Sequence, residues 1–158
     1  MSEPTLAEVR EVGVRLLARR EHSARELGRK LRQRDLPADL IEAALAQLQQ
    51  ERLLSDDRFA EEFARSRRNN GYGPVRIELE LRERGVNAAP ALITETAEEV
   101  WAGLAAAARL KRFGRQLPND ARERNRQYRF LTNRGFTPGQ IRQALAGYEP
   151  DRDIYTYE

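Results

Sequence analysis

Arginines are the residues of this sequence best suited to binding chemistry, and they gather in two places. The first is residues 65–76, RSRRNNGYGPVR, which hold four arginines and one tyrosine but no acidic residue. Guanidinium groups bind phosphate or carboxylate in a bidentate manner, and an aromatic ring can stack on a nucleobase. The candidate binding residues of this segment are Arg65, Arg67, Arg68, Tyr72 and Arg76.

This segment also lies where two helices are expected to meet. One helix ends within it, and Gly73-Pro74 opens the next, with proline at the first helical position. We therefore expect an anion bound by the arginines to find the free backbone amides of the second helix nearby. The structural alternative is that the arginines only complement the negative end of the first helix.

The second gathering lies between residues 101 and 148, a stretch that contains 10 basic residues and only 2 acidic ones. The spacings of Arg122, Arg126 and Arg129 place them on one face of a helix. Such a field attracts phosphate or an acidic protein surface, so the chemistry of the partner stays open. The clustering is not explained by an arginine-rich codon supply alone. The candidate binding residues here are Lys111, Arg112, Arg115, Arg122, Arg126 and Arg129, with Arg109 and Arg124 in the same stretch.

Residues that could catalyse a reaction are scarce. The 158 residues include no cysteine and a single histidine, His22, which precedes an expected helix cap and is best explained as structural. The carboxylates of residues 56, 57, 61 and 62 suit the acidic first turn of a helix better than a metal site. Nucleotide-binding glycine motifs are absent. We therefore expect no enzyme, no metal and no cofactor.

The elements that position these residues are predicted to be helices throughout. Thr5 and Glu8, Ser23 and Glu26, and Thr137 and Gln140 have the spacing of capping boxes, and apolar residues follow them at helical intervals. Runs of alternating β-branched residues are absent, so we expect an all-α fold. There is also no apolar run long enough to span a membrane and no secretory signal, so we expect a cytoplasmic protein.

The sequence repeats with a period of 50 residues. Arg34-Asp35-Leu36, Arg84-Gly85-Val86 and Arg134-Gly135-Phe136 each follow a leucine three residues earlier, as expected of a helix that ends in a left-handed residue. Three tandem three-helix repeats in an elongated array account for this period. The expected divisions are residues 1–54, 55–100 and 101–149, followed by a polar tail at 150–158.

The middle repeat contains the motif LLSDDRFAEEF (residues 53–63), continued by Gly71, Gly73-Pro74 and the Arg-Gly-Val turn. With this motif as its most specific match, the sequence resembles the RecX family of recombinase regulators over nearly its whole length. Asp35 stands where the family often has glycine. Further matching residues are Leu16, Leu17, Arg19, His22, Ser23, Glu26, Leu27, Lys30, Leu31, Arg68, Arg76, Ile77, Glu80, Leu81, Lys111, Arg112, Phe113, Gly114, Arg126, Phe130, Leu131 and Arg134-Gly135-Phe136.

This resemblance implies a small protein that binds the RecA recombinase in the groove of its filament on single-stranded DNA. Filament growth, ATP hydrolysis and strand exchange by RecA would fall as a result, in DNA repair and the SOS response. The alternative is a helical module that binds single-stranded DNA and competes with RecA for it. We expect a monomer, and we expect reversal of Arg67, Arg68 and Arg76 to glutamate to weaken filament binding while leaving helix content intact.

Overall fold

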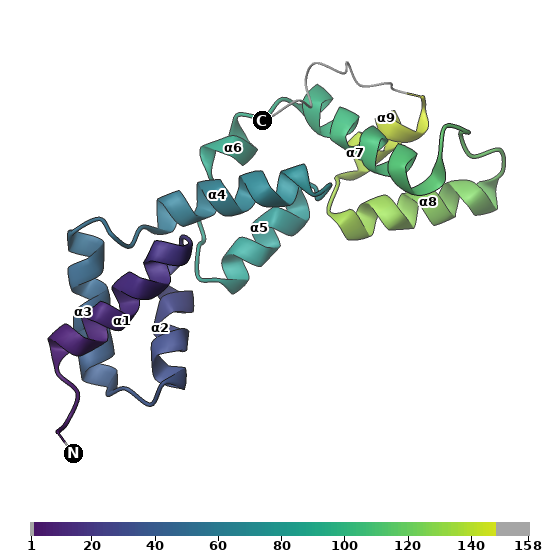
Figure 1. Cartoon of the computed structure of the whole chain (residues 1–158). Helices are drawn as coiled ribbons and strands as arrows, with labels where there is room; N and C mark the ends of the chain where they lie inside the picture. Colours follow the sequence, from purple (N-terminus) through teal and green to yellow (C-terminus); the bar gives the residue numbers. More distant parts are fainter. Residues whose placement is uncertain (1, 148–158) are drawn as a thin grey trace. The chain divides into compact units, whose positions relative to one another are not determined.

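Residues 2–147 are described by the computed structural model, and their regular secondary structure is entirely α-helical, as expected (Figure 1). The expected polar tail at residues 150–158 lies outside the described residues. The helices are α1 (Leu6–Arg19), α2 (Ala24–Gln33), α3 (Ala38–Gln50), α4 (Asp56–Asn69), α5 (Pro74–Glu83), α6 (Ala91–Thr94), α7 (Glu98–Phe113), α8 (Ala121–Arg134) and α9 (Pro138–Leu145).

These helices form three triplets in chain order but two compact units. The N-terminal unit comprises the chain up to residue 63 together with residues 81–88. The C-terminal unit comprises residues 64–80 together with the chain from residue 89 onward. The division passes through α4 and α5, so the middle triplet contributes residues to both units.

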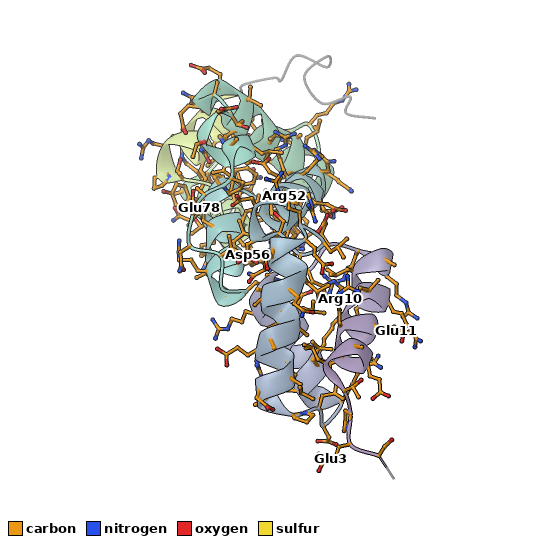
Figure 2. The ribbon with its side chains drawn as sticks, turned by 90° about the vertical axis from the view of Figure 1, so that its left-hand side faces the viewer. Glu3, Arg10, Glu11, Arg52, Asp56 and Glu78 are labelled. Atoms are coloured by element: carbon orange, nitrogen blue, oxygen red, sulfur yellow. The ribbon has the colours of Figure 1, made fainter. Side chains whose placement is uncertain are left out.

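The N-terminal unit is built on a core in which α1 and α2 both pack against α3. Val9, Leu27, Ile41 and Leu48 are buried there, at the helical spacings seen in the sequence. Thr5 and Glu8 form the expected capping box at the start of α1. Asp56, labelled in Figure 2, lies in the first turn of α4. Its side chain accepts a hydrogen bond from the Ala24 amide at 2.8 Å. The carboxylate therefore fixes the start of α2 to the start of α4.

The C-terminal unit has its core where α7 crosses α9 and contacts α8 (Figure 1). Besides Trp101 and Arg109, the buried residues of α7 are small, which lets α9 approach closely with Ile141 and Ala144. At the start of α9, Thr137 and Gln140 form a complete capping box, with proline in the first turn as expected. The helices of this unit are thus held together by an apolar core.

The three repeated turns end their helices in left-handed backbone, as the sequence predicts. Gly85 has φ 82° and Gly135 has φ 94°. Asp35 adopts φ 57° without being glycine, and aspartate is among the side chains that tolerate this region best. The departure from glycine in the first repeat therefore leaves the turn intact.

Each glycine turn also packs against the start of a helix in the preceding triplet. In the C-terminal unit, the Gly73 amide donates to the Arg134 carbonyl at 2.7 Å and the Val75 amide donates to the Gly135 carbonyl at 2.9 Å. A Cβ on Gly135 would lie 2.5 Å from the Arg76 backbone nitrogen. In the N-terminal unit, a Cβ on Gly85 would lie 3.0 Å from the side chain of Arg25. Glycine is therefore required by the packing as well as by its φ.

Two local features differ from the expected pattern. The expected boundary at residue 100 falls inside α7, which begins at Glu98 and is separated from α6 by residues 95–97. The second capping box is only half formed: Ser23 caps the Glu26 amide, but the Glu26 side chain is buried and pairs with Arg20. An internal ion pair has replaced the local hydrogen bond that the motif predicts.

The glycine turns predict a ranked loss of stability. Gly135→Ala should lower the free energy of unfolding by about 3 kcal/mol or more, because a left-handed alanine costs roughly 1–2 kcal/mol and the Arg76 backbone must also move. Gly85→Ala should cost about 1–2 kcal/mol, because only a flexible side chain is in the way. Urea denaturation measures both.

Gly139→Ala is the matched control, since Gly139 lies in α9 and a Cβ there meets nothing within 4 Å. Its stability should be unchanged or slightly increased. Equal losses at Gly135 and Gly139 would contradict the proposed packing of the turn.

Candidate binding surface

The arginine-rich segment 65–76 lies entirely in the C-terminal unit, at the end of α4, the following loop and the start of α5. The first amides of α5 are not free, because those of Gly73 and Val75 donate to the carbonyls of the α8–α9 turn. Pro74 between them has no amide hydrogen. The expected anion site at this helix start is therefore wrong, since backbone carbonyls already occupy it.

Tyr72 is surrounded by guanidinium groups. The Cζ atoms of Arg67, Arg76 and Arg134 lie 3.8, 4.6 and 4.8 Å from the centroid of its ring. Cation–π contacts of this kind stabilise the ring where it is. Arg134 also donates to the Asn70 carbonyl at 3.3 Å. The ring is thus a packing element held by arginines, which argues against the open stacking platform that we expected.

Two of these arginines share Glu80 as an internal partner. Arg67 donates to both Glu80 carboxylate oxygens at 2.8 and 2.7 Å, and Arg76 donates to one of them at 3.1 Å. Arg76 also donates to the Asn133 carbonyl at 2.9 Å. Burial alone would raise the pKa of Glu80, but the hydrogen bonds and charges of Arg67 and Arg76 outweigh it and hold the pKa below its ordinary value.

The expected effect of reversing Arg67, Arg68 and Arg76 therefore needs correction. Glutamate at residue 67 or 76 would face Glu80, and Arg68 is only 7% exposed, so its reversal would bury a carboxylate. These changes would replace the cationic partners Arg67 and Arg76 of the Glu80 carboxylate, which is only 14% exposed, by like charges, which is destabilising. The triple variant should lose the fold of the C-terminal unit, and it cannot report on binding.

Arg68 instead lines a groove within the C-terminal unit, of about 380 Å³. One wall is the end of α4 and its loop, with Asn69, Asn70 and Gly71. The other wall is a face of α7 that presents Leu104, Ala107 and Ala108, with Lys111 at its end. The groove combines an apolar wall with amide groups and two cations, Arg68 and Lys111, one from each arginine-rich stretch.

The exposed candidate cations of the C-terminal unit lie on α4, at the end of α7 and just after it, and along α8. Among the candidates, Arg126 forms an ion pair with Glu123. The Cζ atoms of Arg126 and Arg112 lie 5.2 and 5.5 Å from the centroid of the Phe113 ring. Arg109 is buried and donates to the Gln116 carbonyl and the Gln127 side chain, so it supports the loop before α8. The candidates exposed to solvent are Arg65, Lys111, Arg112, Arg115, Arg122, Arg126 and Arg129.

Within residues 2–147, no group of three histidine, cysteine or acidic side chains is arranged to hold a metal ion. The same residues contain no helix that is long and apolar enough to cross a membrane. In the C-terminal unit, the exposed cations and the groove suit the recognition of anionic or mixed polar surfaces.

Comparison with known proteins places this arrangement in a family. Models of the first, second and third three-helix domains of RecX match residues 10–48, 55–91 and 95–145. The regulatory protein RecX of Halorhodospira halophila is 47% identical over 152 residues, which is 94% of this chain and 93% of the relative. That of Pseudomonas entomophila is 45% identical, with 93% of both chains covered. The chain belongs to the RecX family.

A crystal structure of RecX from Lactobacillus salivarius shares the fold, with a TM-score of 0.75 at 20% identity over 89% of this chain and 94% of that one. The three RecX domains correspond to the three helix triplets. The match to the third domain begins at residue 95, three residues before the start of α7 at Glu98, and the division expected at residue 101 stays a prediction.

His22, the one histidine of this RecX-family chain, is 1% exposed and part of a buried polar cluster. The Lys30 ammonium donates to its Nε2 at 2.9 Å, so the proton sits on Nδ1, which donates to the Arg20 carbonyl at 3.0 Å. Burial first, and then the charges of Arg20 and Lys30, lower the pKa of His22, against the opposing effects of the Arg20 carbonyl and Glu26. The neutral imidazole is a structural support, as the sequence indicates.

Because the folded pKa is lowered, His22 should make stability depend on pH. The unfolded chain binds a proton more readily, so the free energy of unfolding should decrease as pH falls below about 6.5. His22→Gln can still accept a hydrogen bond from Lys30 but does not titrate. We expect the wild type to lose more stability than this variant between about pH 7.5 and 5.5. Parallel stability curves would contradict this assignment.

Proposed function

We propose that this protein is a regulator of the RecA recombinase, which it binds on the single-stranded DNA filament and inhibits. The observation that carries the proposal is membership of the RecX family. The matched relatives are named regulatory protein RecX, and each match covers 93% of the relative's length. A role in recombination, DNA repair and the SOS response, in the cytoplasm, follows from this proposal.

The C-terminal unit supports a contact with the filament. It carries 15 lysine and arginine residues against 11 acidic ones, and its groove offers an apolar wall beside amide groups. A filament of recombinase and DNA presents both phosphates and protein side chains, so a mixed surface of this type suits it. Successive helix triplets that each make a weak contact would bind jointly through effective concentration. Binding of this kind would inhibit RecA by holding its subunits in an arrangement that does not turn over ATP.

The second candidate function is competition for single-stranded DNA. The exposed arginines of α8 favour it, because exposed cations on one helix face suit a phosphate backbone. An interface of this kind should lose affinity steeply with salt, by about 0.7 log units per log unit of salt for each phosphate contact. Stoichiometry and salt dependence therefore separate the two functions.

The deciding experiment measures the single-stranded-DNA-dependent ATPase rate of RecA with increasing amounts of this protein, DNA in excess, at low and moderate salt. We expect inhibition at amounts far below those that cover the DNA, and we expect it to persist at moderate salt. Inhibition only near saturation of the DNA, and abolished by salt, would establish competition for the strand instead.

A charge-neutral variant tests the surface. Lys111→Gln, Arg122→Gln and Arg129→Gln remove three exposed helical cations and keep helix propensity. The amount of protein needed for half-inhibition should rise about tenfold or more, because each lost contact to a charged group is worth roughly 1.5 kcal/mol or more. Its melting temperature should stay within a few degrees of the wild type.

The matched control removes the same charge from exposed sites of the N-terminal unit, through Arg15→Gln, Arg19→Gln and Arg34→Gln. Inhibition should then change less than threefold. If the two triple variants inhibit equally, the C-terminal surface is not the contact with the filament.

A further inference from the structure

A second group of arginines lies in the N-terminal unit, on α2. Arg25, Arg29 and Arg32 follow one another at intervals of four and three residues, so they share one face of the helix. All three are exposed, and none forms an ion pair with another residue of the described chain. Leu27 and Leu31 lie on the buried face of the same helix. Their packing in the core fixes α2 and therefore the position from which the arginines extend.

The turn after α5 forms the opposite wall. Its Gly85 backbone lies against the stem of Arg25, and the Arg84 guanidinium lies 4.7 Å from the centroid of the Phe63 ring. The first contact fixes the wall relative to α2, and the second fixes it relative to α4, within the N-terminal unit. The pocket between the two walls, which is open to solvent and which we name the α2 arginine pocket, has a volume of about 220 Å³ and is lined by Arg25, Glu26, Arg29, Arg32, Glu83 and Arg84.

The charges of this pocket indicate what it binds. The N-terminal unit has 13 basic and 14 acidic residues, so it offers no long-range field for a polyanion. Two carboxylates, Glu26 and Glu83, also line the pocket. Their negative charge opposes any anion, but a ligand with a few separate carboxylates meets less of this repulsion than a continuous phosphate backbone does, and each carboxylate can still reach a guanidinium group. The α2 arginine pocket therefore favours an acidic protein segment over a nucleic acid.

The spacing of the arginines sets the pattern of the ligand. Along the helix axis, Arg25 and Arg29 are separated by about 6 Å, and Arg29 and Arg32 by about 4.5 Å, which is close to one turn. An acidic segment with carboxylates one helical turn apart presents its charges at the same interval. Arginine binds a carboxylate through two parallel hydrogen bonds, so two such contacts fix both position and orientation.

We propose that the α2 arginine pocket is a docking site for an acidic segment of a protein partner, which places two carboxylates against Arg29 and Arg32 about one turn apart. This site goes beyond the proposed function, because it lies in the other unit and requires no DNA. It gives the N-terminal unit a protein-recognition role of its own.

The test uses the full chain and a capped alanine-based peptide with glutamate at every fourth position. Binding is followed by NMR, through the arginine Nε–Hε signals and the backbone amides of α2. We expect saturable shifts confined to α2 and residues 83–85. Arg29→Gln with Arg32→Gln should weaken binding at least tenfold, whereas the control pair Arg15→Gln with Arg19→Gln should change it less than twofold.

Two comparisons make the result decisive. The same peptide with glutamine in place of glutamate should cause no saturable shifts, and an oligothymidylate of matched length should leave the α2 signals unchanged. Absence of binding by the glutamate peptide, or equal binding by both double variants, would overturn the proposal. Equal shifts with oligothymidylate would replace it with a nucleic-acid site. Because no recombinase is present, failure here leaves the RecA proposal to its own ATPase test.

Discussion

The backbone junction between the α8–α9 turn and the start of α5 is the constraint on which the C-terminal unit depends. Two carbonyls of the turn accept the amides of Gly73 and Val75, and a Cβ on Gly73 or Gly135 would lie within 2.6 Å of backbone on the other side. A buried amide left without a partner costs about 1–3 kcal/mol, so the two segments are held together as a pair. The N-terminal unit repeats the arrangement more loosely, where Gly85 meets a side chain instead of backbone.

The junction determines what the neighbouring arginines do. Once the turn lies on the start of α5, Arg134 reaches Tyr72 from one side while Arg67 and Arg76 reach it from α4 and α5. Glu80 then neutralises part of this charge within the fold. Guanidinium groups suit such a position because they stay charged, stack on rings and bind carboxylates with a fixed geometry. Part of the arginine enrichment is therefore internal structure, and an arginine-rich segment is not by itself an exposed binding surface.

Sequence reasoning reached the features that depend on neighbouring residues. Helix caps, the proline at the start of α5 and the left-handed turns follow from contacts within a few positions, so their residue types predicted them. The partners of the arginines could not be predicted from neighbouring residues. Arg76 donates a hydrogen bond to a carbonyl 57 residues away in the sequence, and Arg134 donates to one 64 residues away. The α2 arginine pocket was missed for the same reason. Its three arginines were visible at helical spacing, but the wall from residues 83 and 84 arises only in the folded chain.

The two units use charge in different ways, and this difference follows from their composition. The C-terminal unit has a net excess of cations and many exposed arginines, which act on a polyanion beyond contact distance when ionic strength is low. In the N-terminal unit the positive and negative charges nearly balance, so the unit has little long-range field. Its charged groups act on a ligand at contact distance, which is shorter than the screening length of roughly 8 Å at physiological salt. Approach to a nucleoprotein filament would thus be governed by the C-terminal unit. Selectivity for a protein surface would come from short, directional contacts in the N-terminal unit, where a fixed pocket can distinguish the spacing of carboxylates from that of phosphates.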